Sequence, residues 1–418
     1  MFKNLYLRNY KNLFVPEGFQ LNRLNLFIGP NGCGKSNYIS VLEFFHRALA
    51  PAGPWEGGDM ESDQALTMLG ESRILSGHLS MPERVYFGFE FDFEAFPKGL
   101  RYDLELDILK TGVNVSTEHL ADAIADPFFY FKCHDRHKGT CVVSVYDSPG
   151  QDSRTHLEPF AEVSTRELGL VKLPKFLEES SYPPDHIPFF KSRRALVEAV
   201  RGWHFYNANN MNLGAIRDAA PKIGGSDLLL SPNGENLPLV MENLFQKDFD
   251  FEELLNLAMR TILPDTRRVR PLRTGQLRLS LEWHFTGQSE SFFLSEISDG
   301  TVRMLCWAVI LLSPHPPSLL VIEEPELGLH PAWMPALYEW ICEAAQKTQV
   351  IISTHSPELL DRFTQRLEDV ACFKQTEHKG LFTMTRLSHD MLKDQLNAGW
   401  ELGDLYRIGD PDIGGWPW

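Results

Sequence analysis

The chain has 418 residues, of which 43% are hydrophobic and 23% are charged, the composition of a globular protein with an ample core. Its 40 Lys and Arg stand against 56 Asp and Glu, a net charge of −16, which argues against broad, non-specific adhesion to DNA or anionic membranes and leaves only a local basic groove open. The start MFKNLYLRNYKNLF lacks a sustained apolar core and the run Met304 to Leu312 is too short to span a bilayer, so we expect a cytoplasmic protein with no membrane partner, whose six cysteines are reduced thiols.

The first predicted elements lie on either side of a glycine-rich loop. Apolar and polar residues alternate over Met1 to Leu13, which predicts a strand with one solvated face. Leu24 to Ile28 is a continuous apolar run and predicts a buried strand. Asn37 to Ala48 has apolar residues at helical spacing, so the segment between these two elements connects a strand to a helix.

That segment reads GPNGCGKS and is a complete phosphate-binding loop. Its glycines let the backbone turn tightly, so that successive N–H groups point at phosphates, and the following helix presents its positive end. Lys35 would reach the β- and γ-phosphates and Ser36 would offer its hydroxyl to Mg²⁺. A glycine-rich turn with a stray lysine is the alternative, and the strand before and the helix after oppose it. The predicted nucleotide-binding residues are Gly29, Pro30, Asn31, Gly32, Cys33, Gly34, Lys35, Ser36 and Asn37.

The middle of the chain predicts hairpins and loops. Period-two alternation indicates hairpins over Val85 to Ile108 and over Phe128 to Tyr146, and the prolines of Leu173 to Pro188 indicate a loop. The second hairpin contains Cys133, His134, His137 and Cys141, which could form a zinc site; strand alternation favours a hairpin with two incidental thiols.

The second half alternates helices and strands, and its buried strands predict an α/β fold with a parallel core. Five arginines of a strand pair could meet a nucleic-acid backbone, or could line a solvated face. These arginines are Arg267, Arg268, Arg270, Arg273 and Arg278. The predicted helices are Asn236–Phe245, Glu252–Ile262, Thr301–Leu312 and Ala332–Ala345, and the strands are Arg268–Leu272, Leu277–Phe285, one near Phe292, Leu319–Ile322 and Val350–Ser353.

The run LLVIEEPE ends a buried strand in acids. The carboxyl ends of parallel strands are where α/β folds bind ligands. Glu323 would hold Mg²⁺, directly or through water, and Glu324 would position and deprotonate the attacking water. The alternative is a strand that simply ends in solvated acids, and the phosphate loop upstream disfavours it.

Two further segments belong to the same hypothesis. His355 follows a buried strand, where it could bond a γ-phosphate, although a lone histidine there is more often structural. Ser298, Asp299 and Gly300 begin a helix whose N–H groups could bind an anion, although Ser-Asp-Gly is also ordinary capping chemistry.

The ordered set GPNGCGKS, SDGT, LLVIEEPE, LGLHP and STHSP resembles the ABC-type ATPases of the SMC, RecF and OLD group, above all the stand-alone bacterial ATPases labelled AAA-21 or AAA-15. The N-terminal strand, the segment Ser231 to Leu244 and the tail Trp400 to Gly415 resemble the same group. The resemblance implies a P-loop NTPase of ABC-head type with a mixed or parallel sheet core, an antiparallel β subdomain and a helical second lobe. It divides the chain into 1–111, 112–227, 228–390 and a tail, 391–418.

The resemblance also implies a homodimer or higher oligomer that holds two ATP molecules head to tail. Ser298, Asp299, Gly300 and Thr301 would then touch the ATP on the partner's phosphate loop. ATP-dependent dimerisation would control an effector, a nuclease or toxin in anti-phage defence or DNA repair, and hydrolysis would reopen the dimer, with DNA as a further candidate partner. A scaffold that binds ATP without turnover is the alternative, and a transporter subunit is disfavoured by SDGT. Glu323 stands where an aspartate is usual, and its longer side chain weakens the assignment of direct metal contact to this position.

Overall fold

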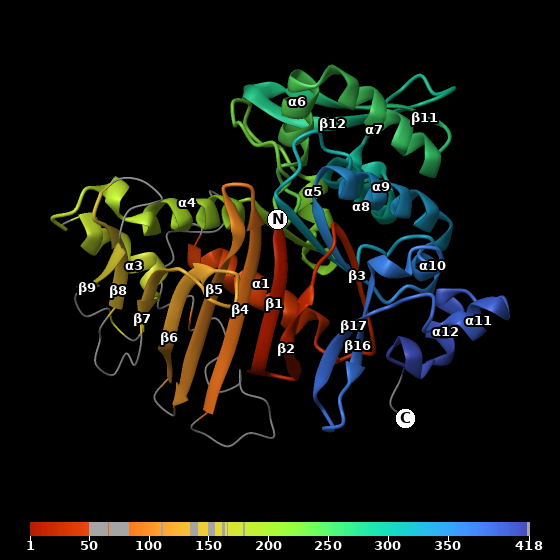
Figure 1. Ribbon diagram of the computed structural model, residues 1–418. Coiled ribbons are helices and arrows are strands. Elements are labelled where there is room, and N and C mark those ends of the chain that lie inside the picture. The colour runs from red at the N-terminus through yellow and green to blue at the C-terminus, as the bar shows by residue number, and fades with distance from the viewer. Residues whose placement is uncertain are drawn as a thin grey trace. The chain divides into compact units, whose positions relative to one another are not determined.

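The computed structural model describes residues 1–49, 66, 83–109, 112–133, 141–148, 155–160, 164, 166–178 and 180–415. These residues form two compact units, each assembled from separate stretches of the chain (Figure 1). Unit 1 comprises Met1–Asn22, Gly29–Trp203 and Phe373–Thr385, and unit 2 comprises Arg23–Ile28, His204–Cys372 and Arg386–Trp418. The division into four segments expected from the sequence stays a prediction.

Unit 1 is built on a sheet that is antiparallel except at one edge. The strand order is β17-β2-β1-β4-β5-β6-β7-β8-β9, and only the pair of β17 and β2 is parallel. The strands are β1 (Phe2–Tyr10), β2 (Leu13–Gln20), β4 (Glu83–Phe93), β5 (Phe96–Leu109), β6 (Gly112–Asp122), β7 (Phe129–Cys133), β8 (Cys141–Tyr146), β9 (Thr155–Phe160) and β17 (Phe382–Arg386). Both predicted hairpins are therefore present, with β6 as an additional strand beside the first.

An aromatic core fixes the helix that follows the phosphate loop. Helices α1 (Lys35–Leu49) and α4 (Pro188–Arg201) contact each other beside the sheet of unit 1, and α4 also contacts β7 and β8 (Figure 1). The Phe45 ring of α1 stacks on Phe89 with 4.0 Å between centroids and on Tyr102 with 5.3 Å. All three side chains are fully buried, so aromatic packing holds α1 against the sheet.

Two predictions about unit 1 are wrong in detail. The first strand ends at Tyr10, because a turn at Lys11 and Asn12 starts β2. The loop expected over Leu173–Pro188 is partly helix, since α3 spans Gly169–Glu178. Its leucines are buried at helical spacing, and this apolar stripe outweighs the proline inside the helix.

The expectation of reduced thiols is wrong for one pair. Cys133 and Cys141 lie directly opposite each other on β7 and β8 and form a disulfide, with 4.2 Å between their Cα atoms. The bond uses both thiols of the alternative zinc site, whose His134 and His137 lie outside the described residues. The other four cysteines are free thiols.

Unit 2 holds the parallel sheet that the sequence predicts. The order is β10-β14-β15-β3-β16, and β14, β15, β3 and β16 run parallel, so their carboxyl ends share one edge. Every residue of β3 and β15 is buried, and so is every residue of β14 up to its final glutamate. The strands are β3 (Leu24–Ile28), β10 (Trp203–Asn207), β14 (Leu319–Glu323), β15 (Gln349–Ser353) and β16 (Val370–Gln375).

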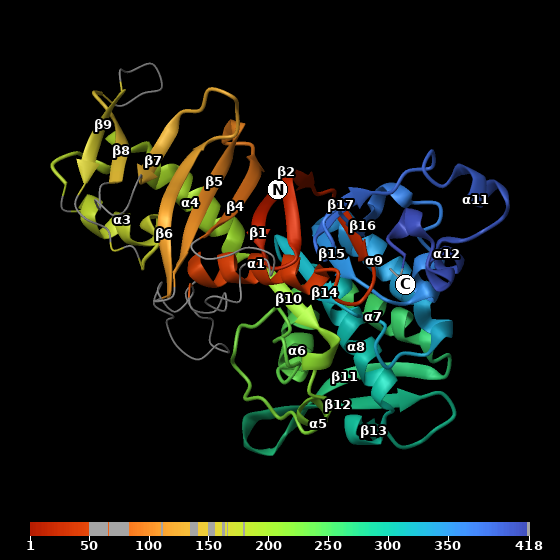
Figure 2. The same cartoon turned by 90° about the horizontal axis from the view of Figure 1, so that it is seen from below.

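Helices and a second, smaller sheet complete unit 2. Figure 2 shows β11 (Thr266–Thr274), β12 (Arg278–Phe285) and β13 (Phe292–Phe293) side by side as that sheet. No helix in the described part of the chain is long and apolar enough to cross a membrane. The helices are α5 (Leu213–Arg217), α6 (Leu237–Lys247), α7 (Phe249–Ile262), α8 (Asp299–Leu311), α9 (Met334–Lys347), α10 (Pro357–Asp361), α11 (Lys393–Asn397) and α12 (Leu402–Ile408).

Candidate functional site

The phosphate loop follows β3 in the chain and ends in the first turn of α1. Gly29, Gly32 and Gly34 all have positive φ, the region that favours glycine. At Gly34 space adds to conformation, because a Cβ there would lie 2.5 Å from Leu13 Cδ2. The Cys33 N–H donates to the Pro30 carbonyl at 3.2 Å and closes the turn. The predicted residues 29–37 thus form one continuous turn and helix start in unit 1.

Lys35 lies folded back on this loop. Its Nζ donates to the Gly29 carbonyl at 2.8 Å and to the Pro30 carbonyl at 3.3 Å, and the side chain is buried. Ser36, one residue on, is exposed. Burial raises the pKa of the neighbouring Cys33 thiol although Lys35 lowers it, so Cys33 packs as a neutral group. Lys35 therefore orders the loop with the same ammonium group that would bind phosphate.

Asn12 supports the loop, a role that the sequence pattern did not predict. Its Nδ2 donates to the Gly32 carbonyl at 2.5 Å, and its Oδ1 accepts from Asn37 Nδ2 at 2.7 Å. Asn12 lies in the turn between β1 and β2, and Asn9 near the end of β1 and Lys11 in the turn have φ of 60° and 49°. Asn9 and Asn12 lie close together near the end of the segment predicted as a strand, and they were the signal in the sequence for this turn.

In unit 2 the structure places the two predicted acids at the carboxyl end of β14. Glu323 Oε1 accepts from Asn207 Nδ2 at 3.1 Å, and Glu324 Oε2 accepts from Asn209 Nδ2 at 3.5 Å. Both amides come from the end of β10, the strand beside β14, and the short turn after it. The sequence pattern did not predict these two asparagines, because their pairing depends on a strand contact with residues more than a hundred positions away.

The backbone of Glu324 is in an unusual conformation. Its φ is +49°, in the left-handed region that residues with a Cβ seldom adopt. Its N–H donates to the Ser353 carbonyl of β15 at 2.9 Å, so the turn is held from the next strand. Strain of this kind costs about 1–3 kcal/mol and is concentrated at functional sites. The geometry favours a functional acid over a strand that simply ends in solvent.

A third acid, Glu326, points into the protein. Its Oε1 accepts from Thr354 Oγ1 at 2.7 Å and from the His355 N–H at 2.8 Å. Its Oε2 is buried and makes no hydrogen bond among the described residues. Burial raises the pKa of Glu326 against the effect of these donors, and the charge of Glu324 raises it further. Glu326 thus connects the segment after β14 to the turn that carries His355.

This raised pKa predicts a pH-dependent loss of stability. The folded protein keeps the Glu326 proton to a higher pH than the unfolded chain, whose ordinary value is 4.5. From about pH 4.5 upward the unfolded chain releases the proton first, so stability falls with rising pH until the folded pKa has been passed. Glu326→Gln should remove this component. Thermal midpoints of the two proteins at a series of pH values measure it.

Glu358→Gln on α10 is the matched control, because the pKa of Glu358 is shifted in the opposite direction to that of Glu326. Hydrogen bonds from its own backbone, Arg407 and Ser356 lower the Glu358 pKa. Its contribution is therefore present above pH 4.5 and is lost as the pH falls through the folded pKa. Equal pH slopes for wild type and Glu326→Gln would contradict the assignment.

His355 is held on two sides at the end of β15. The backbone N–H donates to Glu326, and the ring Nδ1 lies 2.8 Å from the hydroxyl of Tyr406. Tyr406 belongs to α12, fifty-one residues further along the chain. The histidine is half-buried rather than enclosed in the core. This arrangement orients the ring and keeps it accessible.

The SDGT segment begins α8 and shows the capping chemistry weighed as its alternative. Ser298 Oγ accepts from the Thr301 N–H at 3.3 Å and lies 2.7 Å from Thr301 Oγ1. Asp299 forms an ion pair with Arg217 at 2.6 Å. Ser298 and Asp299 are exposed. Capping and nucleotide contact in trans are compatible, because a partner's phosphate would meet the outward side of the same turn.

Helix α8 also contacts the segment that follows the acids. A Cβ on Gly300 would lie 3.0 Å from Trp333 Cζ3 and 3.1 Å from the Gly328 carbonyl oxygen, so a larger residue there would require a neighbour to shift by a few tenths of an ångström. Further along α8 the buried indole N–H of Trp307 donates to the Pro325 carbonyl at 2.9 Å. Helix α8, which begins at SDGT, thus contacts the segment that follows β14, and we call Glu323 to Glu326 the acidic turn.

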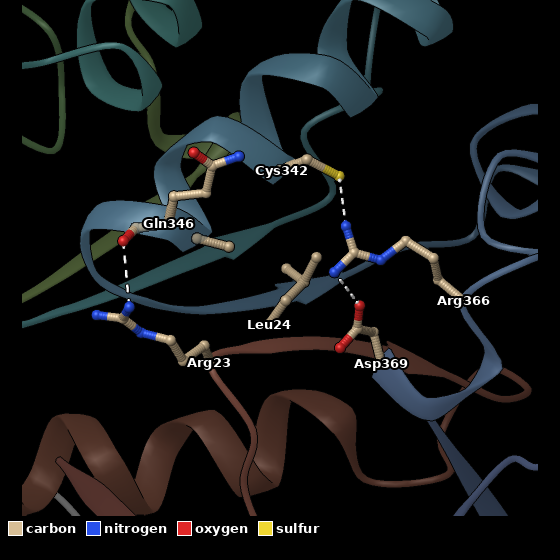
Figure 3. A pocket seen from close by; sticks show the side chains of 7 residues that line it. Arg23, Leu24, Cys342, Gln346, Arg366 and Asp369 are labelled. Carbon is tan, nitrogen blue, oxygen red and sulfur yellow. Dashed lines mark hydrogen bonds and ion pairs between the residues drawn. The ribbon is translucent and has the colours of Figure 1, made fainter.

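A cavity of about 420 Å³ lies elsewhere in unit 2 (Figure 3). Arg23 and Leu24 border it where β3 begins, and Arg366 and Asp369 border it just before β16. It therefore lies at the amino ends of the strands, away from the acids. Arg366 pairs with Asp369 at 2.6 Å, and Arg23 donates to the Gln346 carbonyl at 3.1 Å.

The arginine cluster of β11 and β12 is mostly paired with carboxylates. Ion pairs of this kind reduce the positive charge that a nucleic-acid backbone would meet. They favour the solvated-face interpretation over a DNA-binding groove. The pairs are Arg268 with Glu252, Arg270 with Glu282, and Arg273 with Glu242.

Among solved structures, an SMC head bound to the C-terminal winged-helix domain of ScpA is similar to the chain, with 12% identity, a TM-score of 0.50 and coverage of 93% of this chain and 98% of the other. The SMC head domain from Thermotoga maritima matches with 14% identity, a TM-score of 0.46 and coverage of 93% and 99%. No curated protein sequence matches the chain. A family profile described as "AAA domain, putative AbiEii toxin, Type IV TA system" matches residues 24–361. Because this match spans well over half of the chain, the protein belongs to that family, and it has the α/β P-loop fold of SMC-type ABC ATPase heads.

Proposed function

We propose that the protein binds and hydrolyses ATP, with the residues predicted from the sequence in their expected roles. Lys35 and the N–H groups of the phosphate loop bind the phosphates. Glu324 accepts a proton from the attacking water, and His355 donates to the γ-phosphate. The left-handed backbone of Glu324, bonded to the next strand, is the observation that carries this proposal.

The residues present fit Mg²⁺, which prefers oxygen ligands and keeps several waters. Ser36 offers an exposed hydroxyl and Glu323 a carboxylate oriented by Asn207. No cluster of three or more His, Cys, Asp or Glu that could hold a metal occurs in the described residues, so the phosphates of ATP would supply further ligands. When bound, Mg²⁺ would neutralise the charge that develops on the phosphates.

We infer further that two copies bind ATP between them, head to tail. Ser298, Asp299, Gly300 and Thr301 of one copy would then complete the site on the phosphate loop of the other. Exposure of Ser298 and Asp299 at the start of a thirteen-residue helix supports this role. ATP would close the dimer and hydrolysis would reopen it.

The closed dimer would control an effector, a nuclease or toxin in anti-phage defence or DNA repair, in the cytoplasm. The family description names a toxin and a toxin–antitoxin system, which supports a role in defence. DNA as a partner has little support, given the paired arginines of β11 and β12.

Mixing two inactive variants tests this proposal. Lys35→Ala disables the phosphate loop, and Ser298→Asp keeps an N-cap while placing a carboxylate against the partner's γ-phosphate. Each variant alone should be inactive. An equal mixture should recover about one quarter of wild-type turnover, because about half of the dimers are mixed and each has one intact site.

A mixture of Lys35→Ala with Glu324→Gln is the matched control. In the proposed dimer both lesions affect a protomer's own phosphate-loop site, so no mixed dimer has an intact site and no activity should return. Recovery in the control, or none in the test mixture although ATP drives dimerisation, would contradict the head-to-tail arrangement. Sedimentation velocity with and without ATP measures dimerisation.

A further inference from the structure

The C-terminal tail lies on the segment that carries His355. Helix α12 packs against α10, the short helix that begins two residues after the histidine (Figure 1). Leu402 and Leu405 of α12 are buried in the core of unit 2. The tail is therefore part of the folded unit and not a loose extension.

The sequence of the tail specifies this contact closely. The Gly403 N–H donates to Asp361 Oδ1 at 2.8 Å, and a Cβ on Gly403 would lie 2.2 Å from the Pro357 carbonyl, so only glycine permits the approach. The Leu402 N–H donates to Thr364 Oγ1 at 3.0 Å. At the surface, Arg407 of α12 donates to Glu358 of α10 at 3.2 Å. These bonds set the rotation of α12 about its axis.

That rotation directs Tyr406 at the histidine. The tyrosine is 9% exposed, and its hydroxyl lies 2.8 Å from His355 Nδ1. A neutral imidazole carries its proton on one nitrogen only, and the bond made by the other nitrogen decides which one. If the tyrosine O–H donates to Nδ1, the proton resides on Nε2, which can then donate to a phosphate oxygen.

We propose that Tyr406 is a positioning residue of the ATP site, whose hydroxyl donates to Nδ1 of His355 and keeps the ring in the tautomer protonated on Nε2. The proposal rests on the proposed role of His355 at the γ-phosphate. It assigns a function to the tail, in which α12 places the Tyr406 hydroxyl next to His355 Nδ1. Tyr406 does not touch the nucleotide and acts only through the ring.

Tyr406→Phe tests the proposal, because it removes the hydroxyl and keeps the buried ring. In the full-length protein labelled with ¹⁵N-histidine, NMR distinguishes the two tautomers by the shifts of the ring nitrogens, and His355→Gln assigns the signal. Wild type should show His355 protonated on Nε2, and Tyr406→Phe should shift the population toward Nδ1. The kcat for ATP should fall about 10-fold with KM little changed, as for other residues that orient a functional histidine.

Tyr338→Phe is the matched control. This tyrosine of α9 packs edge-on against Phe363 in the same unit, so the variant loses a hydroxyl away from the histidine and should change neither signal. Gly403→Ala, which forces α12 away from Pro357, should reproduce the tautomer shift of Tyr406→Phe.

An unchanged His355 tautomer in Tyr406→Phe would overturn the proposal. This readout needs no turnover, so it also separates the two hypotheses. A protein without ATPase activity whose tautomer depends on Tyr406 would refute the enzyme and retain the positioning contact. An active enzyme whose His355 tautomer is the same in Tyr406→Phe would retain the proposed ATPase function and refute the positioning role of Tyr406.

Discussion

Glu324→Gln should lower the kcat for ATP hydrolysis by about 10²- to 10⁴-fold, the usual contribution of a positioned general base. The amide keeps the size of the side chain and can still bond Asn209, but it cannot accept a proton from water. ATP binding should remain, so the variant should accumulate as the ATP-bound dimer. Phosphate release and binding of a fluorescent ATP analogue measure the two effects separately.

Glu339→Gln on α9 is a suitable control, because it makes the same chemical change away from the acidic turn. It should leave kcat unchanged. Turnover of Glu324→Gln at the wild-type rate would remove Glu324 as the base and, with it, the central step of the proposed mechanism.

Lys35→Ala should weaken ATP binding by about 100-fold, since a hydrogen bond to a charged group contributes up to about 3 kcal/mol. The variant also loses the bonds from Nζ to the Gly29 and Pro30 carbonyls, so part of the effect reflects a less ordered loop. Titration with the fluorescent analogue measures the affinity, and circular dichroism verifies the fold. Lys347→Ala, which removes an exposed lysine paired with Glu343, should bind normally.

The same two variants separate an enzyme from a scaffold that holds ATP without turnover. Wild type and Glu324→Gln would be equally slow in a scaffold, and Lys35→Ala would dissociate it into monomers. A large difference between wild type and Glu324→Gln instead identifies an ATPase.

The sequence alone was sufficient for the local chemistry. The apolar strand, the loop GPNGCGKS and the helix after it all lie between Leu24 and Leu49, and the structure has the turn and the helix where they were expected. The alternation of helices with buried strands likewise predicted the parallel core of unit 2. Such patterns reflect short-range sterics and burial, which neighbouring residues largely determine.

Only the tertiary structure decided which side chains support these motifs. Asn207 faces Glu323 across 116 positions, and Tyr406 meets His355 across 51. The arginines of β11 gained carboxylate partners, and Cys133 met Cys141 because two strands paired in one register. A hydrogen bond or disulfide depends on distances of a few ångströms between segments that approach only when the sheets and helices pack, and residue spacing along the chain does not encode that approach.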